Sequence, residues 1–102
     1  MDFLSREEVI SGMNHSLEPM LERYKLDEVG IYEEEGEGET YYMGYTIKKD
    51  NKVFMVHLPY EKNQQGELAV KDSNWTIQIE GNEMKNCKTL DQVFNQIDRI
   101  GH

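Results

Sequence analysis

Histidine, cysteine and carboxylate side chains are the groups in this sequence that could carry out chemistry. His15, His57 and His102 show neither an HExxH motif nor another paired spacing, so they do not indicate a metal site. Cys87 is the only cysteine, and without a Cys-His-Asn order it is interpreted as a buried or idle thiol rather than a nucleophile. The 20 acidic residues are so numerous that no pair stands out as a general acid and base.

The sequence lacks the common motifs for binding nucleotides, phosphates or calcium and the nucleophile motif of hydrolases. There is no GxxxxGK loop, no GxGxxG after a strand and no GxSxG elbow. Residues 33–39 read EEEGEGE, which would repel a phosphate and lacks the Asp/Asn spacing of an EF-hand loop. A solvated loop is favoured there over weak cation binding. We expect no cofactor and no metal, and binding rather than catalysis.

Charge and length define the kind of molecule that must position these groups. The 102 residues suffice for one hydrophobic core, so we expect one domain over residues 1–102. A net charge of −9 disfavours nucleic acids and anionic membranes as partners. No apolar run approaches the roughly 20 residues of a membrane span, and the opening MDFLSREEVI lacks the features of a secretory signal. Together with the single cysteine, these features predict a cytoplasmic protein.

An amphipathic helix is predicted near the N-terminus. Ser5 and Glu8 have the spacing of a capping box. The helical spacing then continues through one apolar stripe: Val9, Met13, Leu17, Met20, Leu21 and Tyr24. Pro19 interrupts the backbone hydrogen bonds but not the stripe, which favours one kinked helix. Two short helices, with Ser16 capping the second, are the alternative.

The period changes to two after the helix, which predicts strands. Val29 and Ile31 begin a short strand that runs into the acidic stretch at residues 33–39, interpreted as a mobile connection. Residues 40–48 and 53–60 predict a hairpin that turns near Asp50 and Asn51. One register makes every inward-facing pair apolar or aromatic: Ile47–Phe54, Tyr45–Val56, Met43–Leu58 and Tyr41–Tyr60.

A second hairpin and a closing helix complete the prediction. The hairpin would turn at Asp72 and Ser73. Its predicted pairs are Val70–Trp75 and Leu68–Ile77. The helix begins at a capping box of Thr89 and Gln92 and stops at Gly101. We therefore expect an α+β fold, with one antiparallel sheet of about five strands between an N-terminal and a C-terminal helix, both helices packed on one face.

The reverse face of the first hairpin is less polar than a solvated surface. The register pairs Gly44 with His57, Tyr42 with Pro59, Thr46 with Met55, and Lys48 with Val53. The glycine should leave a shallow gap, surrounded by a cluster that includes Tyr32 of the neighbouring strand. We hypothesise that this cluster binds a protein partner or a second copy of the chain: Tyr32, Tyr42, Val53, Met55 and His57. Strand propensity alone, or a covering loop or helix, is the alternative explanation.

Four segments carry a resemblance to a known group of proteins. They are MDFLSREEVI, YYMGY, NWTIQIEG and KTLDQVFNQI. In these segments the chain resembles the small, acidic, uncharacterised proteins of bacilli. The resemblance implies a bacterial cytosolic protein without an assigned activity, and it supplies no functional residue.

The favoured function is therefore a non-enzymatic protein-binding or regulatory module. One alternative is a small-molecule-binding protein or enzyme, with a cavity between the helices and Tyr41, Tyr45 and Tyr60. Another is an acidic mimic of nucleic acid, which would need carboxylates at the spacing of backbone phosphates.

Overall fold

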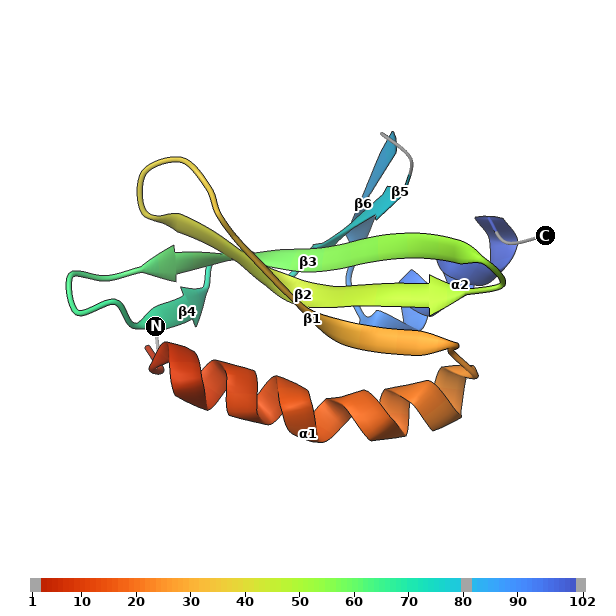
Figure 1. Cartoon of the computed structure of the whole chain (residues 1–102). Helices are drawn as coiled ribbons and strands as arrows, with labels where there is room; N and C mark the ends of the chain where they lie inside the picture. The colour runs from red at the N-terminus through yellow and green to blue at the C-terminus, as the bar shows by residue number, and fades with distance from the viewer. Residues whose placement is uncertain (1–2, 80–81, 101–102) are drawn as a thin grey trace.

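Two helices and an antiparallel sheet make up the chain, which the computed structural model describes over residues 3–79 and 82–100 (Figure 1). The described elements are α1 (Arg6–Tyr24), β1 (Glu28–Glu35), β2 (Thr40–Lys49), β3 (Lys52–Lys62), β4 (Leu68–Val70), β5 (Trp75–Ile79), β6 (Asn82–Cys87) and α2 (Leu90–Ile100). The main path of the sheet is β1-β2-β3-β5-β6, and the short β4 also pairs with β3. This arrangement confirms the predicted α+β fold.

Helix α1 begins at the predicted capping box. The Ser5 hydroxyl accepts the Glu8 N–H at 3.2 Å, and the Glu8 carboxylate accepts the Ser5 N–H at 3.2 Å. Pro19 lies inside one uninterrupted helix, so the alternative of two short helices is wrong. Ser16 does not cap a second helix, because its hydroxyl donates to the Gly12 carbonyl at 3.2 Å.

The hairpin of β2 and β3 has the predicted register throughout. Its turn residues, Asp50 and Asn51, have φ values of 53° and 65°, which is the left-handed backbone of a type I′ turn. Lys49 therefore faces Lys52, and the predicted apolar pairs follow along the strands. The side chains of these pairs are buried or half-buried on one face of the sheet. A shift of the register by one residue would turn one strand's core side chains to the other face and expose them.

Strand β1 is longer than predicted and includes half of the acidic stretch. Residues 33–35 pair with residues 41–43 of β2, so the interpretation of residues 33–39 as a loop is wrong for its first part. Arg6 forms an ion pair with Glu33, and Lys62 lies 3.6 Å from Glu35. These cations offset the repulsion between the carboxylates and allow the strand to continue.

The predicted second hairpin is wrong, because β4 and β5 both pair with β3. The chain reverses earlier, at residues 63–67, where Gly66 has a φ of 80° and the Asn63 side chain accepts two backbone N–H groups. Asp72 and Ser73 lie in the interruption between β4 and β5. Opposite that interruption Pro59 accepts the Lys71 N–H at 2.9 Å but has no N–H to return.

Strand β6 was not predicted, and it pairs with β5 along the far edge of the sheet. Thr89 then accepts the Gln92 N–H at 3.1 Å, as predicted for the start of α2. The Gln92 side chain accepts the N–H of Lys88 at 2.8 Å, one residue before the expected partner. The predicted helix stop at Gly101 lies outside the described residues.

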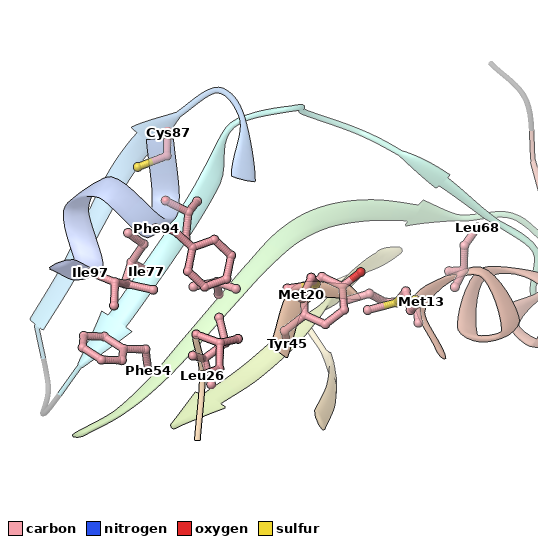
Figure 2. Close-up of a cluster of buried hydrophobic side chains, with 14 residues drawn as sticks. Met13, Met20, Leu26, Tyr45, Phe54, Leu68, Ile77, Cys87, Phe94 and Ile97 are labelled. Atoms are coloured by element: carbon pink, nitrogen blue, oxygen red, sulfur yellow. The ribbon is translucent and has the colours of Figure 1, made fainter. Parts of the chain in front are cut away.

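Both helices pack on the same face of the sheet, where the core lies (Figure 2). The core side chains are Met13, Met20, Leu26, Met43, Tyr45, Ile47, Phe54, Val56, Leu68, Ile77, Cys87, Val93, Phe94 and Ile97. Tyr24 of α1 stacks on Phe94 of α2 with ring centroids 3.8 Å apart, which joins the helices. At the opposite end of α1, Leu4 and Leu68 exchange two backbone hydrogen bonds of 2.9 and 2.7 Å.

Candidate functional site

The sheet face that points away from both helices carries the residues predicted to bind a partner. Side chains alternate between the two faces along each strand, so the register fixes which residues share this face. We call it the open face and define it by Gly30, Tyr32, Glu34, Tyr42, Gly44, Thr46, Val53, Met55 and His57.

Gly44 lies at the centre of the open face, and β3 closes on it. A Cβ atom at Gly44 would lie 1.8 Å from the carbonyl oxygen of Val56 and 2.6 Å from the Cα of His57. Both distances are far below any real contact, so a side chain here would displace the backbone of β3. The predicted gap at this glycine is therefore wrong. Its function is to let the two strands approach.

An aromatic cluster surrounds Gly44, and it contains three of the five predicted residues. The His57 ring lies 5.6 Å from the Tyr32 ring and 5.1 Å from the Tyr42 ring, the second pair edge to face. Tyr32 and His57 are both paired with Gly44, from opposite sides of β2. His57 is only 7% exposed. The tyrosines are half-buried, so they present the surface of the cluster and His57 supports them.

The other two predicted residues lie further along the hairpin, beside a hollow. Val53 is 55% exposed, more than the other exposed large apolar side chains, Leu4 and Val70, whereas Met55 is half-buried. The hollow has a volume of about 240 Å³. Its lining residues are Glu28, Val29, Gly30, Thr46, Lys48 and Val53. The open face therefore combines an aromatic cluster with a hollow further along the hairpin.

Gly30 makes this hollow, and the sequence reasoning missed it. A Cβ atom at Gly30 would meet nothing within 4 Å, so the glycine leaves space above the sheet. The available signal was strand alternation, because Gly30 lies between Val29 and Ile31, which face the core, and must face the other side of the sheet. Glu28 and Lys48 at the rim of the hollow add one charge of each sign.

The hydroxyl group of Tyr32 donates to the Glu34 carboxylate on the same strand. Burial, this hydrogen bond and the charge of Glu34 raise the pKa of Tyr32 to about 12. Tyr32 therefore stays neutral at physiological pH and acts as an amphipathic contact group rather than an acid or base.

A second concave feature lies on the helix side, between α1 and β4. It is a groove of about 320 Å³. Its lining residues are Leu4, Glu8, Val9, Gly12, Met13, Ser16, Tyr45, Tyr60, Leu68, Ala69 and Val70. Burial raises the pKa of both Tyr45 and Tyr60, two of the three tyrosines expected around a cavity. Tyr41 does not line it.

The remaining candidates for chemistry do not converge. His15 is exposed on α1, where its ring nitrogen lies 2.7 Å from the Ser11 carbonyl oxygen. Cys87 is buried, and burial raises the pKa of its thiol, which makes it a poor nucleophile at neutral pH. Among the residues that the structure describes, no group of three or more metal-ligating side chains comes together, and no helix is long and apolar enough to cross a membrane.

Comparison with known proteins places the chain in a family. No curated protein matches it. One family model, described as a family of unknown function (DUF5634), matches residues 3–97 and so covers nearly all of the helices and the whole sheet. The chain therefore belongs to the DUF5634 family of unknown function.

Proposed function

We propose that the chain is a non-enzymatic module of the bacterial cytosol that binds a second protein through its open face. The observation that carries this proposal is that one face holds both the exposed side chain of Val53 and, further along the hairpin, the half-buried rings of Tyr32 and Tyr42. Both helices lie on the other face, so these apolar side chains are not needed to build the core. Aromatic and apolar side chains around a hollow are typical of the centre of a protein interface.

The charge of the chain selects the kind of partner. Glu28 and Lys48 at the hollow carry opposite charges, but Glu34 adds a carboxylate beside Tyr32, and the net charge of the chain is −9. Two copies would repel each other, whereas a basic protein surface would be attracted. The proposed partner is therefore a protein with a basic contact surface, and self-association is the alternative outcome of the test.

Two matched substitutions test the open face. Val53 on β3 and Val70 on β4 are both exposed strand valines, at 55% and 44%, but Val70 borders the groove on the helix side. Val53→Lys should abolish recovery of a basic protein by affinity capture from native lysate, and Val70→Lys should not. The recovered protein is then purified and titrated against both variants. Equal binding by Val53→Lys and wild type would refute the open-face proposal. If wild type sediments as a dimer, the occupant of the open face would be a second copy of the chain rather than a different protein.

The groove between α1 and β4 supports a second candidate function, the binding of a small molecule. The tyrosine hydroxyls of Tyr45 and Tyr60 would give an apolar ligand its orientation. Gly12 keeps the groove open, because a Cβ atom there would meet nothing within 4 Å. Thermal-shift screening of neutral and cationic apolar compounds tests this function. A genuine ligand should stabilise wild type and the Val53→Lys variant equally, and it should not stabilise Gly12→Leu or Val70→Lys.

A further inference from the structure

Strand β1 forms one edge of the sheet, and it is long and regular for an edge. It pairs with β2 along all eight of its residues, from Glu28 opposite Lys48 to Glu35 opposite Tyr41. Its sequence contains no proline and no lysine, and its described ladder shows no bulge. Proteins commonly use these devices to prevent an edge from accepting another strand.

Two hydrogen bonds at the start of β2 show which backbone groups of β1 point outward. Gly36 donates to the Thr40 carbonyl at 3.0 Å, while Lys62 of β3 continues the ladder on the other side of β2 by donating to Glu39 at 2.8 Å. In an antiparallel ladder this alternation directs the even-numbered residues of β1 toward β2. The N–H and C=O groups of Val29, Ile31 and Glu33 therefore point away from the sheet.

The charge of the edge determines which strand could pair with it. Residues 28–39 contain six glutamates and no lysine or arginine. Pairing of two β1 strands would bring like charges side by side, which is destabilising, so the edge is protected against a second copy of itself. A strand with lysine or arginine at alternate positions would have the opposite charge.

We propose that β1 accepts a basic, extended segment of the partner protein as an additional antiparallel or parallel strand. On the open face, the basic side chains of that segment would lie beside the hollow at Gly30, the ring of Tyr32 and the carboxylate of Glu34. On the helix side, small or apolar side chains would lie beside Val29 and Ile31, which pack against the core. This inference rests on the proposed protein-binding function and names the chemistry of the partner.

Amide hydrogen exchange with a synthetic peptide tests strand addition residue by residue. The probe is a peptide about as long as β1 in which lysine alternates with threonine. Binding should slow exchange at the outward amides of Val29, Ile31 and Glu33 by about tenfold or more at saturation, with little change at Tyr32 and Glu34, which already face β2. A peptide with glutamate in place of lysine should have no effect.

Backbone methylation separates strand addition from a purely ionic contact. Two further peptides carry N-methyl groups on alternate residues. In the first peptide the methyl groups lie along one edge of the extended backbone, and in the second they lie along the opposite edge. Only one of them should lose binding, by about tenfold or more, because a single edge of the peptide pairs with β1. Equal binding by both, or no protection at the outward amides, would overturn the proposal.

A matched pair of variants provides the control within the chain. Glu33→Pro and Glu33→Val both remove the contact with Arg6, but only proline removes the outward N–H donor. Glu33→Pro should bind the peptide more weakly than Glu33→Val. The Val53→Lys variant distinguishes the two proposals: if it loses the cellular partner but keeps the peptide, the open face and the edge act separately. If wild type captures its partner through Val53 yet no basic peptide protects β1, strand addition fails and the open-face function stands.

Discussion

The ammonium group of Lys49 lies 3.0 Å from the backbone carbonyl oxygen of Tyr24, so the end of β2 is tied to the last turn of α1. The same nitrogen lies 2.5 Å from an Asp98 carboxylate oxygen on α2. One cation thus satisfies an orphan carbonyl at a helix C-terminus and connects the helices to the sheet.

Replacement of Lys49 by methionine should lower the free energy of unfolding by about 1–2 kcal/mol, because the carbonyl of Tyr24 loses a charged donor while the aliphatic stem is kept. Asp98→Asn, which removes only the exposed ion pair, should cost less than about 1 kcal/mol. Urea titration of the three proteins measures both changes. An equal loss in the two variants would show that the contact with Tyr24 contributes nothing.

Gly44→Ala should destabilise the protein by about 3 kcal/mol or prevent folding, because the new Cβ would overlap the backbone of β3 at Val56. Gly30→Ala is the matched control on the neighbouring strand, where the Cβ meets open space. Its effect should be neutral or stabilising, within about 1 kcal/mol. Thermal unfolding of both variants gives the comparison, and a Gly44→Ala protein as stable as wild type would contradict the close approach.

Stability should decrease with rising pH between about pH 10 and 12, in part through Tyr32. The unfolded chain releases the tyrosine proton near its ordinary pKa of 10.0, whereas Tyr32 in the folded protein has a pKa of about 12. The folded state therefore binds more protons within this window, and alkali favours unfolding. Tyr32→Phe should make the urea midpoint less dependent on pH in this range. An unchanged pH dependence would show that the half-buried position of Tyr32 and its contact with Glu34 do not raise its pKa.

Cys87 should react with a thiol reagent only when the protein opens. It is buried in the core, and burial raises the pKa of its thiol. We expect labelling at neutral pH to be about a hundredfold or more slower than in urea. Reaction of the native protein at the unfolded rate would place the thiol at the surface.

The first hairpin could be predicted in full because local turn chemistry and core pairing agree. Asp50 and Asn51 favour the left-handed turn, and the register that follows buries each apolar pair. At Asp72 and Ser73 the same kind of local signal was misleading. The strand partner there is β3, and the interruption depends on Pro59, which is distant in sequence.

The residues that share the open face could be predicted, but the directions and exposure of their side chains could not. The register of β2 and β3, which follows from the sequence, places Tyr42, Met55 and His57 on one face. The burial of His57 depends on the side chain of Tyr32, which reaches it across Gly44 from another strand. Pairing patterns give neighbours but not side-chain directions or exposure. Strand β6 was missed because NEMKNC has no alternation of apolar and polar residues.

The paired hydrogen bonds between Leu4 and Leu68 have a consequence for how the chain acquires its structure. They join positions 4 and 68, which are 64 positions apart in the sequence (68 − 4 = 64). The start of α1 is therefore held by a strand far along the chain as well as by its own capping box. Closing a loop of this length costs conformational entropy and slows folding, so we expect the Leu4–Leu68 pair to form late.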